Sequence, residues 1–289
     1  MIKKQTFVDP SSVTGQSIDK MLNTIRIPPR PSLLLEVQRE LNSSDPAPQN
    51  LSAIIGQDVA MAAALLKLAN SAFIGLRLKA KSVDQAVMRL GMEQCSLLLT
   101  GLLAREVVQV EGIVLNQFWD SSNKRAQAMS YFAKKMTLCR SDLAHTFGLF
   151  SNIGVPLMMS KFPDYSAVLE GTLRAEPCVT TLAEDRHFGV NHAALGSLMA
   201  RTWGLPDEVV DAILLHHSYE VLRDQNTSNT VRNMIALSLL VDFAITNYQS
   251  GKTINDWEVG GEAVRTYLGI SQSEADDISD QIQQRFEEA

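Results

Sequence analysis

Apolar residues recur every three or four positions along most of the chain, and this helical period constrains the fold more than any other feature. Segment 116–136 shows it clearly, because its apolar residues share one helical face. Alternating apolar and polar runs bounded by turns, which are typical of strands, are essentially absent. We therefore predict an all-α fold.

Residues with short polar side chains divide this pattern into separate helices. Asp58 and Asn191 stand where N-terminal caps belong, immediately before apolar helical segments. A capping box places Ser or Thr three residues before Glu or Gln at a helix start. This spacing predicts helix starts at Ser82 with Gln85, Thr181 with Glu184, and Ser271 with Glu274.

The length of 289 residues predicts two packed subdomains, because single domains usually span about 100 to 200 residues. Residues 1–19 are polar and without helical period, so we expect a flexible tail there. We place a first helical subdomain at residues 20–112. The second takes residues 113–289 and includes the C-terminal helix.

Composition argues against several classes of protein. The net charge is −6 and no long run of like charges occurs, so a nucleic-acid partner is disfavoured. The three cysteines lack Cys-x-x-Cys spacing, which favours a reducing cytoplasm over a disulfide framework or a zinc knuckle. Long apolar runs, such as residues 97–104, fall short of the ~20 residues that span a bilayer. We expect a cytoplasmic protein without signal peptide or membrane span.

Five histidines are the first candidates for a metal or acid-base site, but their spacing alone is a weak signal. His187 and His192 are five residues apart, which is not the spacing of a helical zinc-protease pair. His216 and His217 fall in a helix that Pro206 is expected to open. Neighbours on a helix point about 100° apart, so we expect at most one of the two to face a given pocket. The fifth is His145.

Four segments together resemble the HDOD family, and the similarity extends from about residue 20 to about residue 245. They are Ile-Pro-Pro-Arg-Pro at 27–31, Ile-Ile-Gly-Gln-Asp at 54–58, Leu-Leu-Lys-Leu-Ala-Asn-Ser-Ala-Phe-Ile-Gly at 65–75, and Ser-Val-Asp-Gln-Ala-Val at 82–87 followed by Leu-Gly at 90–91. The resemblance implies a helical N-terminal subdomain packed on a bundle like that of the HD and HD-GYP phosphohydrolases. In those relatives, His and Asp side chains hold metal ions that activate water against a phosphoester.

The metal-binding pattern of the catalytic relatives is broken in this sequence. The family's Gly-Leu-Leu-His-Asp-Ile-Gly appears here at 148–154 with Ser151 and Asn152 in place of the His-Asp pair. Ser121 replaces an earlier histidine ligand. Neutral side chains cannot supply the charge of a bridging aspartate. We therefore expect no catalytic residue, cofactor or resident metal. The positions that match ligands of the relatives and keep suitable side chains are His192, His216, His217 and Asp242.

Three functions follow from this reading. The first is a non-catalytic bacterial signal-transduction adaptor, which would bind a signalling protein in trans because the sequence shows none of the receiver, GGDEF or EAL domains to which HDOD domains are often fused. The second is a metal-dependent phosphohydrolase or phosphodiesterase with an altered ligand set that uses His192, His216 or His217, and Asp242. The third is binding of a nucleotide or other small ligand without hydrolysis.

Overall fold

The computed structural model of the chain describes residues 27–71, 74, 78–110, 113, 115–175, 178–250 and 254–287. These residues form helices and, apart from one isolated bridge between Val110 and Ile113, carry no β-structure. The prediction of an all-α fold is confirmed. The tail expected at residues 1–19 lies outside the described part of the chain.

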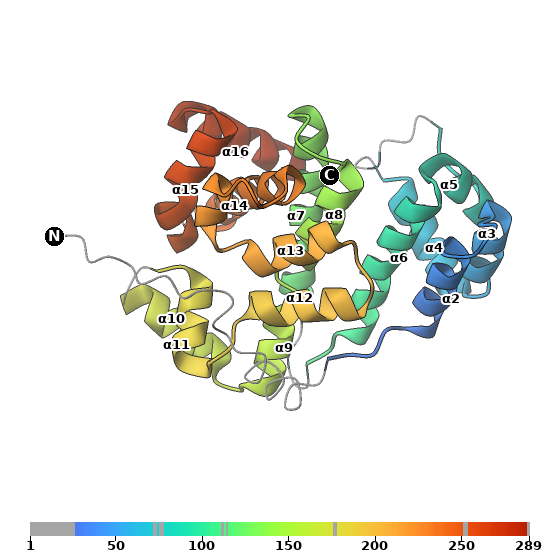
Figure 1. Cartoon of the computed structure of the whole chain (residues 1–289), viewed down its shortest axis with the longest axis horizontal. Helices are drawn as coiled ribbons and strands as arrows, with labels where there is room; N and C mark the ends of the chain where they lie inside the picture. The colour runs from blue at the N-terminus through green and yellow to red at the C-terminus, as the bar shows by residue number, and fades with distance from the viewer. Residues whose placement is uncertain are drawn as a thin grey trace.

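Five helices form the N-terminal subdomain, drawn in blue to blue-green in Figure 1. Two of them begin at the predicted caps: the Asp58 carboxylate accepts from the Met61 amide at 2.9 Å, and Ser82 Oγ accepts from the Gln85 amide at 3.2 Å. These bonds satisfy backbone donors that a helix start leaves unpaired. The helices are α2 (Ser32–Leu41), α3 (Pro48–Gly56), α4 (Val59–Ala69), α5 (Val83–Leu90) and α6 (Met92–Val107).

The second subdomain is a larger bundle around the long helices α7 and α14 (Figure 1). Its core contains Phe132, Phe147 and Phe150 together with the apolar residues of α14. The elements are α7 (Asn116–Lys135), α8 (Ser141–Phe150), α9 (Gly154–Lys161), α10 (Tyr165–Ala175), α11 (Thr180–Phe188), α12 (His192–Thr202), α13 (Asp207–Leu215), the 3-10 helix η2 (Tyr219–Arg223), α14 (Asn229–Ser250), α15 (Asn255–Leu268) and α16 (Gln272–Glu287).

The two subdomains meet at the end of α12 and along α6, which packs on α8. Trp203 is fully buried, and its indole N–H donates to the Pro28 carbonyl at 3.0 Å. Gln38 of α2 donates to the Trp203 carbonyl at 3.0 Å. These bonds fasten the proline-rich entry segment to the bundle. The division at residues 112 and 113 stays a prediction.

The two later capping-box patterns have different outcomes. Ser271 and Glu274 make both reciprocal bonds, at 2.7 and 3.2 Å, so that prediction is confirmed. The prediction for Thr181 and Glu184 is wrong, because α11 begins at Thr180 and its cap position is Val179, two residues before Thr181. Glu184 is instead completely buried and bonds to a histidine. No helix in the described residues is long and apolar enough to cross a membrane.

Candidate metal centre

Helix ends bring three histidines together inside the second subdomain. His192 is the first residue of α12, whose start is capped by the Asn191 side chain as predicted. The start of α12 lies directly against α9 at Gly154, where an added Cβ would stand 2.0 Å from the His192 carbonyl oxygen. Only glycine permits this approach. His216 and His217 reach the same place from the end of α13.

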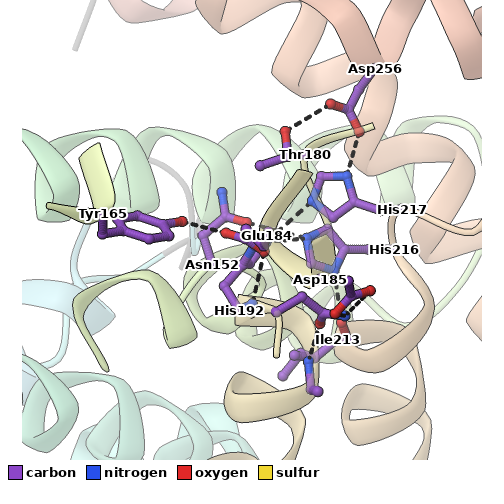
Figure 2. Close-up of polar contacts among 12 residues, drawn as sticks. Asn152, Tyr165, Thr180, Glu184, Asp185, His192, Ile213, His216, His217 and Asp256 are labelled. Carbon is purple, nitrogen blue, oxygen red and sulfur yellow. Dashed lines mark hydrogen bonds and ion pairs between the residues drawn. The ribbon is translucent and has the colours of Figure 1, made fainter. Parts of the chain in front are cut away.

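The prediction that at most one of His216 and His217 could face a pocket is wrong. Helix α13 ends at Leu215, so the two histidines follow the helix instead of continuing it. His216 Nδ1 turns back and donates to the Ile213 carbonyl at 2.7 Å. The 100° separation of helical neighbours therefore does not apply, and both rings point to one centre (Figure 2).

The Nε2 atoms of the three imidazoles converge. His192 Nε2 lies 3.3 Å from His216 Nε2 and 3.2 Å from His217 Nε2. In each ring Nδ1 faces a group that can only accept: the Glu184 carboxylate, the Ile213 carbonyl and the Asp256 carboxylate, respectively. Each Nδ1 therefore carries a proton, and a ring in its neutral form presents an Nε2 lone pair to the centre. Facing lone pairs require a cation or a proton between them.

The Glu184 carboxylate fixes His192. Its oxygens lie 2.8 and 2.9 Å from His192 Nδ1, and one of them accepts from the His192 backbone amide at 2.9 Å. The Tyr165 hydroxyl donates to the same carboxylate. Although burial alone would raise the pKa of Glu184, the nearby His192 charge and these hydrogen bonds lower it. Glu184 is therefore an ionised, buried carboxylate that orients one imidazole.

The Asp256 carboxylate plays the same part for His217 from the other side, as Figure 2 shows. It also accepts from the Tyr219 hydroxyl at 2.9 Å and the Thr180 hydroxyl at 3.1 Å. Against the effect of burial, the charge of His217 and these bonds lower the pKa of Asp256 to about 2. Burial opposes the protonation of His217, but the charge of Asp256 and the bond to it raise the His217 pKa overall.

Asn152 stands at the edge of this cluster. Its side-chain oxygen lies 3.2 Å from His216 Nε2, which is also an acceptor. Burial and the neighbouring histidines hold the pKa of His216 well below its usual value, so this ring stays neutral. Two acceptors at this distance need a cation between them or an amide turned so that its NH₂ group donates.

The three histidines fit a transition-metal ion such as Zn²⁺. Imidazole is a preferred ligand of zinc, copper, nickel and iron. Two nitrogens about 2.0 to 2.1 Å from one tetrahedral ion lie about 3.3 to 3.4 Å apart, which agrees with the observed separations of 3.2 and 3.3 Å. Carboxylates on the opposite ring nitrogens are the usual supports of metal-binding histidines. The chain supplies two of them, Glu184 and Asp256.

The place of the missing His-Asp pair is different in character. Gly148 of α8 packs so closely on α7 that an added Cβ would lie 2.8 Å from Ala126 Cα. The helices are joined by a short connection and run antiparallel, so Ser151, one turn further along α8, stands level with Ser122 of α7. Both hydroxyls are buried and have no hydrogen-bond partner among the described residues. Neutral hydroxyls are poor substitutes for metal-binding imidazole and carboxylate.

Asp242, the remaining candidate ligand, is bound to Arg125. The Nε and Nη2 atoms of Arg125 both lie 2.6 Å from Asp242 Oδ1, and the side chains are 9% and 23% exposed. Asp242 is not part of the histidine cluster. The residues in this half do not fit a second metal ion, since its carboxylate is engaged and the others are neutral. Ser121, on α7, has an interaction of its own.

Sequence reasoning therefore found the three histidines but missed the residues that orient or neutralise the centre. Glu184 lies eight residues before His192, but its spacing from Thr181 predicts a helix cap instead of a buried support. Arg125 interrupts the apolar face of α7, and a buried arginine needs a partner. Asp256 had no such signal, because it lies on a helix that only the fold brings to His217. The missed residues are Arg125, Tyr165, Glu184, Tyr219 and Asp256.

Comparison with known proteins agrees with this structure. A protein of Treponema pallidum (strain Nichols), described as uncharacterized, is 32% identical over 198 residues, which cover 66% of this chain and 38% of that protein. This chain thus spans well under half of that relative's length.

Two solved structures share the fold. A proposed phosphohydrolase from Shewanella amazonensis SB2B has a TM-score of 0.66 at 20% identity, over 93% of this chain and 92% of that one. A proposed signal transduction protein from Marinobacter aquaeolei VT8 has a TM-score of 0.67 at 21% identity, over 97% of this chain and 65% of that one. The family model described as HDOD domain matches residues 27–219, which is well over half of the chain. The chain belongs to the HDOD family.

Proposed function

We propose that this chain is a non-hydrolytic signalling module that holds a single transition-metal ion at His192, His216 and His217. The asymmetry of the centre carries the proposal: three oriented imidazoles remain, whereas Ser151 and Asn152 stand where the relatives have a metal-binding pair. Two-metal hydrolysis needs ions on both sides of the reacting phosphate. A three-histidine centre without a bridging carboxylate has the ligands for one. This proposal of one bound ion replaces the expectation from the sequence that no metal binds, because the three histidines converge in the fold.

Several observations support a role in signalling. One of the structural neighbours is described as a proposed signal transduction protein. The histidine cluster joins α12 and the end of α13, and its carboxylates come from α11 and α15. An ion bound there would hold these four segments in one arrangement. A protein partner that contacts their outer surface would then recognise the metal-bound form in trans.

The test is metal analysis together with hydrolysis assays on protein purified without chelators. Substrates are bis(p-nitrophenyl) phosphate and a panel of cyclic dinucleotides. We expect one bound ion per chain, lost in His192→Ala, and no turnover. His187→Ala is the matched control, because His187 bonds to Thr172 at the surface and should not affect the ion. Stoichiometric metal together with turnover that His192→Ala abolishes would overturn the proposal.

The second candidate is a one-metal phosphohydrolase with an altered ligand set. The oriented His192, His216 and His217 favour it, because metal-dependent hydrolases commonly hold a catalytic ion with three protein ligands and leave one position for water. A structural neighbour described as a proposed phosphohydrolase is consistent with it. When bound, such an ion would lower the pKa of a water molecule. The same assays decide between the two candidates.

Binding of a nucleotide without hydrolysis has weaker support. Arg125 is the basic side chain that the fold brings to this region, and it is already paired with Asp242. Calorimetry with a nucleotide panel tests this function directly. Heat of binding that Arg125→Gln removes would favour it over the metal-holding module.

A further inference from the structure

We propose that the guanidinium of Arg125 takes the place of a second metal ion, so that the centre can bind one metal ion but not two. This inference deepens the proposed function, on which it rests, because it names the residue that limits the centre to one ion.

Arg125 is largely buried and Asp242 is partly buried, so each of the two charges needs a partner. An ionised carboxylate removed from water is costly unless a cation and hydrogen bonds compensate it. Two guanidinium nitrogens at 2.6 Å supply both to Asp242 Oδ1. In a metal centre an ion would supply the same charge. Here the cation is tethered to α7, and it is permanent because a guanidinium does not lose its proton in proteins.

The surroundings of Arg125 agree with a former metal position. Ser122 lies one turn before Arg125 on α7, and the hydroxyls of Ser122 and Ser151 are buried without a hydrogen-bond partner among the described residues.

Arg125 opposes a second ion in two ways. It holds Oδ1, one of the two carboxylate oxygens of Asp242, with two short contacts. It also places a unit positive charge against the carboxylate that a second divalent cation would have to bind, and repulsion between like charges is strong at short range in a poorly hydrated interior. Restoring the lost His-Asp pair should therefore not be sufficient to restore a second metal site.

A restoration series tests this inference by the number of bound ions. The protein, Ser151→His/Asn152→Asp, and Ser151→His/Asn152→Asp/Arg125→Ala are each loaded with Mn²⁺ or Zn²⁺, desalted, and analysed for metal content. We expect the double variant to bind as many ions as the parent protein and the triple variant to bind one more. The inference would be overturned if the double variant bound an additional ion, or if the triple variant bound no more ions than the parent protein. Circular dichroism checks that each variant is folded.

A rescue experiment keeps the inference testable if the restored variants do not fold. Arg125→Gln removes the cation and leaves Asp242 unpaired, so its melting temperature should fall. Added Mn²⁺ should raise that temperature by several degrees more in Arg125→Gln than in Arg125→Gln/Asp242→Asn, because only the former keeps the free carboxylate. Equal shifts in the two variants would contradict a metal-like role.

The two proposals fail in different ways. Hydrolysis by the unmodified protein would overturn the proposed function but leave the ion counts of the restoration series interpretable. A second ion bound with Arg125 in place would overturn this inference while leaving the three-histidine centre intact. Arg125→Lys is the conservative control, since it keeps the positive charge and should keep the parent's metal count.

Discussion

The two halves of the old HD site have diverged in opposite directions. In the histidine half, every imidazole has its outer nitrogen bonded to an acceptor, and its Nε2 faces the centre. In the Ser151 half, the hydroxyls of Ser122 and Ser151 have no hydrogen-bond partner in the described part of the chain, and the remaining carboxylate, Asp242, is paired with Arg125. Loss of ligands in one half therefore leaves the imidazoles of the other half oriented, because Glu184 and Asp256 still bond to two of them.

The largest expected effect is the loss of the buried carboxylate in the histidine half. Glu184→Ala leaves His192 Nδ1, its backbone amide and the Tyr165 hydroxyl without their acceptor. Removing one partner from a buried, hydrogen-bonded pair costs about 3 to 5 kcal/mol. Urea unfolding should show this decrease in the free energy of unfolding. Glu274→Ala, at the exposed capping box, is the matched control and should lose much less. Equal losses would mean that the Glu184 network is unimportant.

His145 lies on α8, the helix that ends next to Ser151, and is buried outside the histidine cluster. Burial lowers the pKa of His145 to about 4, although Asp142 partly opposes the shift. The unfolded chain takes up this proton near pH 6.5, and the folded chain only near pH 4. Stability should therefore fall as the pH drops from about 6.5 to 4, by about 3 kcal/mol, and this contribution should level off below pH 4.

Denaturant unfolding at several pH values measures this effect as the difference between the protein and His145→Gln. The difference isolates His145 from the other acid-sensitive groups. If the two pH profiles ran parallel between pH 4 and 6.5, His145 would not be the source of the acid sensitivity.

The support of His217 should appear in the affinity for metal. The Asp256 carboxylate orients His217 and increases the basicity of its ring, and Asp256→Asn removes that charge. Loss of such a supporting carboxylate typically weakens metal binding about 10- to 100-fold. Competition with a chromophoric chelator measures the Zn²⁺ affinity. Asp142→Asn, which affects a carboxylate paired with the exposed Arg140, is the control. An Asp256→Asn affinity like that of the control would refute the supporting role.

The smallest effect is expected at the orphaned hydroxyl. Ser151→Ala removes a buried group that has no partner among the described residues, so stability should change by less than about 0.5 kcal/mol. Ser82→Ala removes a working helix cap and should cost about 1 kcal/mol. Thermal unfolding of both variants compares them. A larger loss for Ser151→Ala than for Ser82→Ala would show that Ser151 is part of a bonded network.

The sequence predicted the helices well where local chemistry decides them. Asp58, Ser82 and Asn191 act as the expected caps, because a cap depends only on residues within one turn. The prediction for Glu184 was wrong because the same spacing also lets a glutamate turn inward to His192. Local pattern alone does not distinguish a surface cap from a buried support.

The candidate site was predictable in its ligands but not in its organisation. His192, His216 and His217 stood out by residue type and resemblance, yet their convergence depends on α13 ending at Leu215. Arg125 is 117 positions from Asp242, and His217 is 39 from Asp256. Such pairings are set by the packing of α7, α14 and α15, which no local periodicity reveals.

The metal content of the protein, purified without chelators and loaded with Zn²⁺, tests the central claim most directly. We expect one ion per chain, with an X-ray absorption spectrum typical of nitrogen ligands, and loss of that ion in His216→Ala. Two ions per chain would contradict the claim that the Ser151 half does not bind a metal ion. No ion at all would contradict the claim that His192, His216 and His217 bind one.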